Sequence, residues 1–161
     1  MKRRSAWLAM ACGLVLAGCA TPPAPETDRP EQSWSGRLAV QVHSAPPQSL
    51  SAGFELNGSP TVGELRLLSP LGTTLAIVRW SPGQAQLQRG NEWTDANSLQ
   101  TLSETLLGTD VPVTALFDWL NGQATAVPGW QADLSRLDDG RLSATRQSPL
   151  PAADLRLVLD R

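Results

Sequence analysis

The sequence has 161 residues, of which 41% are hydrophobic and 17% are charged. This length and composition predict a single domain with a packed core, and they exclude a chain that is disordered throughout. The formal net charge is −2, and the sequence contains one His and two Cys. These counts argue against a nucleic-acid-binding protein, a metal site built from His or Cys, and a disulfide-stabilised scaffold.

The amino-terminal residues have the pattern of a secretory leader. Met1–Arg4 is basic, and the apolar run that follows is shorter than the about 20 residues of a membrane-spanning helix. The run ends in Leu16-Ala17-Gly18-Cys19, which resembles the lipobox of bacterial lipoproteins. That resemblance implies a signal peptide over residues 1–18 and a lipidated Cys19. Because Ala20 replaces the Asp of retained lipoproteins, it also implies an outer-membrane anchor that faces the periplasm.

Residues 19–33 differ in composition from the residues that follow. Four prolines lie there among Thr, Ala, Glu, Asp and Arg. Such a segment buries little apolar area, and its prolines stiffen it. We therefore expect a flexible Pro-rich tether between Cys19 and a folded domain over residues 34–161. The alternative is a binding motif for a proline-recognising module.

Loss of the leader makes the protein more acidic. Without residues 1–18 the chain has ten basic and fifteen acidic side chains, a net charge of −5. An acidic rim would steer a basic partner toward the protein, with an association rate that falls as salt rises. The alternative is that these charges serve solubility alone.

Alternating apolar and polar residues predict a series of strands after residue 34. Alternation of this kind indicates one buried face on each strand, and clusters of Pro, Gly and Asn mark the turns between them. In the third strand Leu68 interrupts the alternation, so the face that points inward is ambiguous. The expected strands cover residues 38–42, 50–56, 64–68, 73–80 and 84–88, with a short edge strand over 91–94.

The spacing of apolar residues then changes to that of helices. Leucines three and four residues apart predict a helix over 99–106, which Asn97 or Ser98 caps and Gly108 ends. A second amphipathic helix is expected over 113–120.

Alternation returns after the Pro128-Gly129 break. It predicts strands around residues 130–134, 142–144 and 155–159, with a hairpin signal at Asp139-Gly140.

This order of elements predicts a mainly β fold with helices, of the α+β class. One apolar face per strand suits an antiparallel meander, and the helices must cover that face or lie across the mouth of a curved sheet. A sheet covered in this way can enclose an apolar cavity. The alternative is that the same residues form a solid core.

An ordered set of motifs resembles the LolB family, the outer-membrane receptors of the lipoprotein-localisation pathway in Gram-negative bacteria. The resemblance covers residue 34 to about residue 122 and thins beyond, so the pairing of the last strands stays open. The motifs that carry it, besides the lipobox, are Trp34-Ser35-Gly36-Arg37-Leu38-Ala39-Val40, Ser51-Ala52-Gly53-Phe54, Leu67-Leu68-Ser69-Pro70-Leu71-Gly72-Thr73, Pro82-Gly83 with Ala85 and Leu87, Leu106-Leu107-Gly108, Val111-Pro112-Val113 and Leu116-Phe117-Asp118-Trp119-Leu120-Asn121-Gly122.

The resemblance implies an incomplete antiparallel β-barrel with a helical lid over an apolar cavity. It implies that a periplasmic carrier, LolA, delivers lipoproteins, and that the receptor shelters their acyl chains and inserts them into the inner leaflet of the outer membrane. Cargo lipoproteins and outer-membrane lipid are then the other partners. No cofactor, metal or nucleic acid is expected, and we expect a monomer.

Three groups of residues are candidates for this activity. Leu71 lies between Pro70 and Gly72 in a tight loop, so we expect it to be exposed. The resemblance implies that this loop pushes cargo lipids into the membrane, whereas the alternative is a leucine folded back onto the sheet. The acyl-chain cavity is expected to have Leu38, Val40, Phe54, Leu56, Leu65 and Leu67 in its wall and Leu116, Phe117 and Leu120 in its lid.

Two other classes of protein remain as alternatives. An esterase would need a nucleophile and a base, but the sequence has no Gly-x-Ser-x-Gly elbow and His43 stands beside a turn. We therefore expect His43 to be an exposed residue at a strand end, and the protein not to be an enzyme. The second alternative is a non-transporting outer-membrane lipoprotein that acts as an envelope scaffold or assembly partner, since the lipobox fits it equally well.

Overall fold

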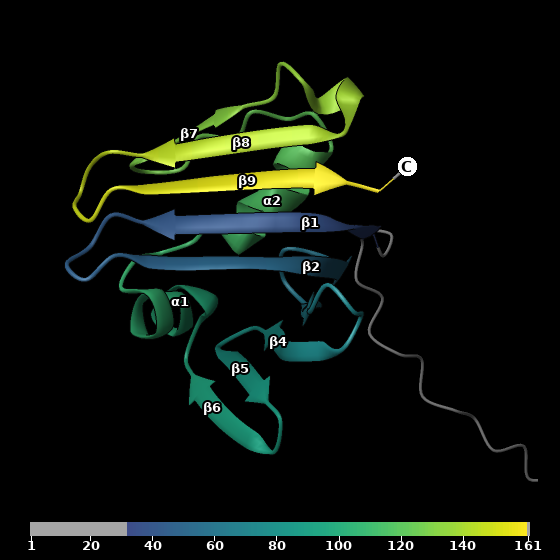
Figure 1. Ribbon diagram of the computed structural model, residues 1–161, viewed down its shortest axis with the longest axis vertical. Coiled ribbons are helices and arrows are strands. Elements are labelled where there is room, and N and C mark those ends of the chain that lie inside the picture. Colours follow the sequence, from purple (N-terminus) through teal and green to yellow (C-terminus); the bar gives the residue numbers. More distant parts are fainter. Residues whose placement is uncertain (1–31, 161) are drawn as a thin grey trace, which may run out of the picture.

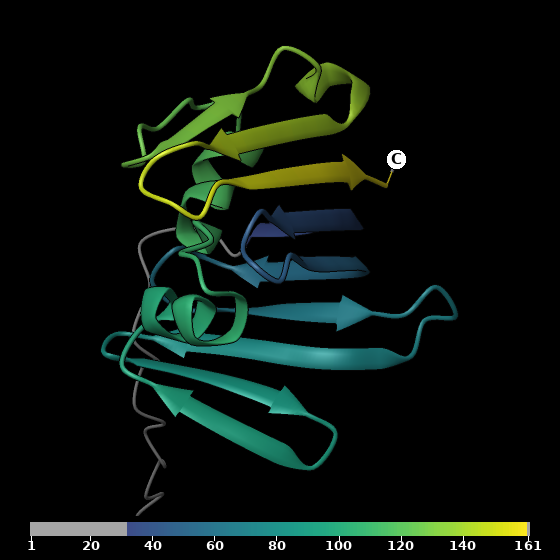
Figure 2. The same cartoon turned by 60° about the vertical axis from the view of Figure 1, so that its left-hand side comes forward.

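The computed structural model describes residues 32–160, which form one antiparallel sheet with two α-helices against its concave face (Figures 1 and 2). Its nine strands lie in the order β6-β5-β4-β3-β2-β1-β9-β8-β7. The strongly curved sheet is an incomplete barrel, because the edge strands β6 and β7 do not pair with each other within the described residues. The expected signal peptide, Cys19 and most of the expected tether lie outside these residues.

The observed elements confirm the predicted order of strands, two helices and strands. The first two strands have 11 residues each and begin before their apolar alternation does. The strands are β1 (Gln32–Val42), β2 (Gln48–Gly58), β3 (Gly63–Leu68), β4 (Thr74–Ser81), β5 (Gln84–Arg89), β6 (Glu92–Ala96), β7 (Trp130–Asp133), β8 (Arg141–Arg146) and β9 (Ala153–Leu159), and the helices are α1 (Leu99–Leu107) and α2 (Val113–Leu120).

The last three strands join the sheet through β1. β9 pairs with both β1 and β8, so the two meanders β1–β6 and β7–β9 share one continuous sheet. Leu155 lies opposite Val40, and Leu157 lies opposite Leu38. This register places the apolar face of the last strand on the same side as that of the first.

The β7–β8 connection is longer than the Asp139-Gly140 hairpin signal indicates. A 3₁₀ turn over Leu137–Asp139 precedes β8, and Gly140 ends that turn with φ 71°. Its N–H donates to the carbonyl of Leu137 at 2.8 Å. Gly140 therefore ends a short helical turn in the left-handed conformation. A tight hairpin turn also favours Gly for its positive φ, so the sequence signal fits both structures.

A β-bulge explains the ambiguous third strand. The register between β3 and β4 shifts between Leu67 and Leu68. Leu65 and Leu67 are buried on the inner face, whereas Leu68 is only half-buried. The interruption in the alternation therefore marks the point where the strand bends before its loop.

Helix α2 belongs to the packed core. Six of its eight residues are buried. The ring of Phe117 meets Trp34 and Trp80 edge-on, with ring centroids 5.5 and 6.1 Å away. The indole of Trp119 is fully buried, and its Nε1 donates to the carbonyl of Thr125 at 2.9 Å. Aromatic packing of this kind fills one end of the barrel and holds α2 in place.

Helix α1 is attached more loosely. Ser98 caps its first turn by accepting a hydrogen bond from the N–H of Thr101 at 3.1 Å, and Gly108 ends it with φ 69°. Leu102 is its one buried residue. The helix lies beside β5 and β6, the strands at one edge of the sheet (Figure 2). Its remaining leucines are half-buried and face inward over a space that α2 does not fill.

Candidate functional site

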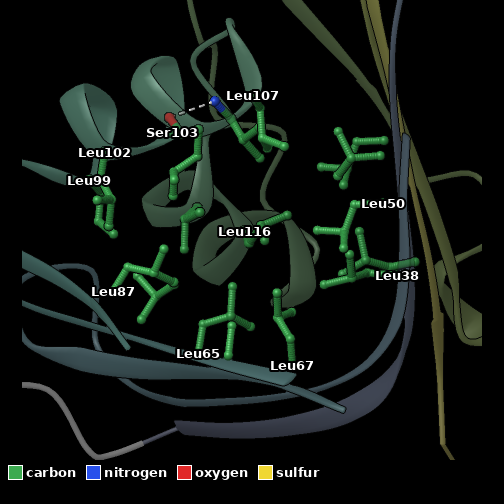
Figure 3. Close-up of a pocket in the computed structure, with 18 of the residues that line it drawn as sticks. Leu38, Leu50, Leu65, Leu67, Leu87, Leu99, Leu102, Ser103, Leu107 and Leu116 are labelled. Carbon is green, nitrogen blue, oxygen red and sulfur yellow. Dashed lines mark hydrogen bonds between the residues drawn. The ribbon is translucent and has the colours of Figure 1, made fainter. Parts of the chain in front are cut away.

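An apolar cavity of about 100 Å³ lies between the two helices and the inner face of the sheet (Figure 3). Seventeen of its nineteen lining residues are apolar, and Arg89 and Ser103 are the two exceptions. Leucine is the commonest residue in the wall. A surface of this kind attracts hydrocarbon without fixing its position by directional bonds.

The strands supply the cavity wall through their alternation. Every second residue of a strand points to the same face, and the inner face is the apolar one. Six strands contribute to this wall, and their side chains are all apolar except that of Arg89 at the end of β5. The strand residues in the wall are Leu38, Val40, Leu50, Leu65, Leu67, Ala76, Val78, Leu87, Arg89, Leu155 and Leu157.

Five of the nine predicted cavity residues line this space, and four do not. The five are Leu38, Val40, Leu65, Leu67 and Leu116. The other four, Phe54, Leu56, Phe117 and Leu120, are buried in the adjoining core instead.

The aromatic packing around α2 explains where those four residues lie. Leu56 pairs with Trp34 across β1 and β2. Phe117 packs on that same Trp34. The interior is therefore filled at this end of the barrel, and the free space is left farther along the strands.

The helical side of the cavity differs from the prediction. Of the expected lid residues on α2 only Leu116 reaches the cavity, whereas α1 turns a row of leucines toward it (Figure 3). Because α1 buries one residue and α2 buries six, α1 is the candidate lid and α2 is part of the packed core. The α1 residues that line the cavity are Leu99, Leu102, Ser103, Leu106 and Leu107.

The hydroxyl of Ser103 is occupied by structural hydrogen bonds. It accepts from the backbone N–H of Val111 at 3.2 Å, drawn as the dashed line in Figure 3, and it donates to the carbonyl of Gln100 at 3.0 Å. This hydroxyl fastens the lid to the segment before α2. The cavity interior therefore offers a ligand no free hydroxyl from Ser103.

The segment between the helices is held by β7. The indole Nε1 of Trp130 donates to the backbone carbonyl of Asp110 at 3.1 Å. Burial raises the pKa of the Asp110 carboxyl above its ordinary value, and the nearby Glu104 raises it further, whereas Arg146 opposes both. The connection that carries the lid thus includes a carboxyl that is poorly solvated when charged.

A second feature is the loop between β3 and β4, which projects from the body of the molecule (Figure 2). The side chain of Leu71 at its tip is 94% exposed. The hydroxyl of Ser69 accepts hydrogen bonds from the N–H groups of Leu71 and Thr73, and the N–H of Gly72 donates to the Ser69 carbonyl at 2.9 Å. The exposed leucine is therefore presented by an internally bonded turn.

His43 has a structural role at the surface. Its Nε2 lies 2.8 Å from a carboxylate oxygen of Asp154, and its backbone N–H donates to the carbonyl of Ala152 at 2.8 Å. Both side chains are partly exposed. These contacts tie the end of β1 to the start of β9.

Residues 32–160 lack two features that would indicate other functions. No helix there is long and apolar enough to cross a membrane. The same residues contain no group of three or more His, Cys, Asp or Glu side chains placed to hold a metal ion.

Comparison with known proteins identifies the family. Residues 31–154 match the family model described as "Outer membrane lipoprotein LolB". Curated proteins named outer-membrane lipoprotein LolB are similar over nearly the whole chain. The relative from Bordetella pertussis is 36% identical over 90% of this chain and 86% of its own length. Those from Bordetella petrii and Cupriavidus metallidurans are 34% and 35% identical, over 89% and 91% of this chain and 85% and 74% of their own lengths. The chain therefore belongs to the LolB family of outer-membrane lipoproteins.

Proposed function

We propose that this protein takes the acyl chains of lipoproteins into the cavity beneath α1 and releases them into the inner leaflet of the outer membrane. Membership of the LolB family makes it an outer-membrane lipoprotein of the lipoprotein-localisation pathway and disfavours a non-transporting scaffold. The observation that carries the proposal is the cavity itself, in which seventeen of nineteen lining residues are apolar.

The size of the cavity requires the lid to move. A cavity of about 150 Å³ in another protein holds one benzene molecule, and the space here is about 100 Å³. The lipid of a lipoprotein is several times longer than benzene, so the cavity must widen before it can take up acyl chains. Movement of α1 away from β5 and β6 enlarges the space, since α1 buries only Leu102 completely.

The transfer needs no chemical step by the protein. Each methylene exposed to water costs about 0.8 kcal/mol. An acyl chain that passes directly from one apolar environment to another avoids this cost. A wall without placed donors holds it weakly enough for release to the bilayer. We propose that the protein acts in this way without catalysis and without a cofactor.

The anchor keeps the domain near its target. We propose that Cys19 is acylated and that residues 20–31 connect it to β1 on the periplasmic side of the outer membrane. A segment of twelve residues reaches at most about 40 Å when fully extended. The domain therefore works within about one domain diameter of the membrane surface, where its projecting loop can touch lipid.

The loop that carries Leu71 is the proposed contact with the membrane. An exposed leucine on a turn held by Ser69 loses little conformational freedom when it enters the lipid interface. We propose that its insertion disturbs the lipid packing where the cargo leaves the cavity. Pro70 and Gly72 shape the turn, and Gly72 adopts φ 81°.

The donor of the cargo is proposed to be the periplasmic carrier LolA. Transfer is downhill when the receptor's cavity binds the acyl chains more tightly than the carrier's does. The acidic balance of the chain supports association with a basic rim on that carrier.

Reconstitution with purified components tests the proposal. The mature chain with Cys19→Ala carries no acyl chains of its own, so its cavity is available to cargo. When it is mixed with a carrier–lipoprotein complex, we expect labelled lipoprotein to move to this protein, and then to liposomes only when Cys19 is intact and acylated. Cargo that stays on the carrier at all protein concentrations contradicts the proposal.

A further inference from the structure

One charged residue stands at the edge of the apolar cavity. Arg89 is the only charged residue among the described residues that line the cavity. It is the last residue of β5 and follows Leu87 by two positions, so its side chain starts on the inner face. The residue is exposed, which places its charged group at the mouth of the cavity rather than inside.

The guanidinium of Arg89 is uncommitted within residues 32–160. Three other arginines on the sheet have partners: Arg66 and Arg79 pair with Glu64, and Arg146 donates to Thr109. Glu92 is the cross-strand neighbour of Arg89, yet the two side chains form no ion pair. The donors of Arg89 are therefore available to a ligand that lies across the mouth.

The cargo has polar groups next to its acyl chains, and these groups would lie near the mouth of the cavity when the chains are inside. A lipidated cysteine carries its acyl chains on ester and amide carbonyl groups, which lie between the hydrocarbon and the polypeptide. When the chains enter the cavity these carbonyl oxygens leave water, and an oxygen without a donor costs about 1–3 kcal/mol. Ser103 cannot supply a donor, because its hydroxyl proton is directed to Gln100.

We propose that Arg89 positions the lipid of the cargo by donating hydrogen bonds to the ester carbonyl oxygens of its diacylglyceryl group. The inference rests on the proposed function and adds the chemical group that the site recognises. The apolar stem of an arginine packs along hydrocarbon, while its head offers five donors. Bonds from a charged donor are roughly twice as strong as neutral ones. The site therefore distinguishes acyl esters from plain hydrocarbon and sets how deep the chains lie.

A pair of ligands that differ only in their carbonyl groups tests this role. Dioctanoylglycerol has two ester carbonyls, whereas dioctylglycerol has the same chains on ether oxygens. Both are titrated into the mature Cys19→Ala chain, and their affinities are measured by displacement of a fluorescent naphthylamine probe. The variants are Arg89→Met and Arg89→Lys. Arg141→Met is the matched control, since Arg141 is an exposed arginine that does not line the cavity.

We expect Arg89→Met to weaken the ester ligand about tenfold, which corresponds to about 1.4 kcal/mol, and to leave the ether ligand within about twofold. Arg89→Lys should recover part of the ester preference, and Arg141→Met should change neither affinity. Equal weakening of both ligands, or no weakening of either, overturns the role of Arg89 while the cavity function stands. Failure of both ligands to bind the unsubstituted chain contradicts the proposed function itself.

Discussion

The guanidinium of Arg146 on β8 donates a hydrogen bond to the hydroxyl of Thr109, which lies 37 residues earlier in the segment between α1 and α2. The same nitrogen lies 3.4 Å from the carbonyl oxygen of Asp110. Thr109 is only 2% exposed. Thr109 and Asp110 are thus fastened to the sheet, and Gly108 is the residue between that fastening and α1. We therefore expect opening of the cavity to swing α1 about Gly108 and to break the Ser103–Val111 hydrogen bond, while α2 stays in the core.

Replacement of Arg146 by Leu should loosen the fastening. The buried hydroxyl of Thr109 then loses its donor, which we expect to destabilise the protein by about 1–3 kcal/mol in urea unfolding. Hydrogen exchange should rise in α1 and in residues 108–112 more than in α2. The matched control is Arg141→Leu on the same strand, which should change neither measurement. Equal acceleration in both helices would show that they move as one unit.

The charge of Asp110 should make the stability depend on pH. Because burial and Glu104 raise its pKa in the folded protein, the folded state binds a proton more readily than the unfolded chain does. This group's contribution therefore favours folding below the ordinary pKa of 3.8. It is lost as pH rises through the raised value.

Asp110→Asn removes that dependence. We expect the variant to be more stable than the unsubstituted protein at pH 7, with a difference that shrinks as pH falls toward 3.8. Urea unfolding at a series of pH values measures it. Asp95→Asn is a suitable control, because Asp95 is a surface carboxylate on β6 away from the helix connection. A variant that is less stable than the unsubstituted protein at pH 7, with a deficit that shrinks on acidification, would show that the contact with Arg146 outweighs burial.

Filling the cavity should abolish lipid uptake without unfolding the protein. Val78 lines the cavity and is only half-buried, so Val78→Phe adds apolar atoms to free space. Overpacking of a full core costs about 1–3 kcal/mol, and a smaller loss is expected where space is available. Displacement of a fluorescent fatty acid measures uptake, and Val158→Phe on the outer face is the control. Unchanged uptake by a folded Val78→Phe protein would place the ligand elsewhere.

The sequence predicts the elements of this fold better than it predicts the cavity. Ser98 and Gly108 mark the ends of α1 because a capping hydroxyl and a left-handed glycine have local requirements. Alternation identifies the inner face of most strands, as it does for Leu38 and Val40. It says nothing about the position along the barrel. Phe54 therefore shares that face but lies in the filled core.

Long-range pairing accounts for the residues that the sequence analysis missed. Leu155 and Leu157 were predicted as part of a final strand, and they line the cavity because that strand pairs with β1. The spacing of the leucines in α1 predicts a helix. It does not reveal that α2, and not α1, packs against Trp34 and Trp80. Which helix is the lid depends on Phe117 meeting Trp34 and Trp80 from distant strands.

Carrier association should depend on salt if the acidic balance of the chain steers the encounter. The Debye length falls from about 10 Å at 0.1 M salt to about 3 Å at 1 M, so attraction between opposite rims is screened. We expect the association rate with the carrier, measured by stopped-flow fluorescence, to fall several-fold over this range while the dissociation rate changes little. An association rate that is independent of salt would show that the acidic residues do not steer the carrier and serve solubility alone.

Leu71→Glu should separate uptake from delivery. The side chain lies outside the cavity and is 94% exposed, so its replacement leaves the fold and transfer from the carrier intact. A carboxylate is expelled from the lipid interface that a leucine enters. The free energies of inserting Leu and Glu differ by more than about 1.4 kcal/mol. We therefore expect delivery to liposomes to slow at least about tenfold.

Leu150→Glu is the matched control for this substitution. Leu150 is 81% exposed on the β8–β9 connection, a different loop from the one proposed to enter the membrane. Both variants add one negative charge. If that charge alone slowed delivery, the two variants would be slowed equally. Delivery that is slow in Leu71→Glu alone, with normal uptake in both, assigns membrane contact to the β3–β4 loop. If Leu71→Glu also loses uptake to the same degree, the loop acts at the carrier and not at the membrane.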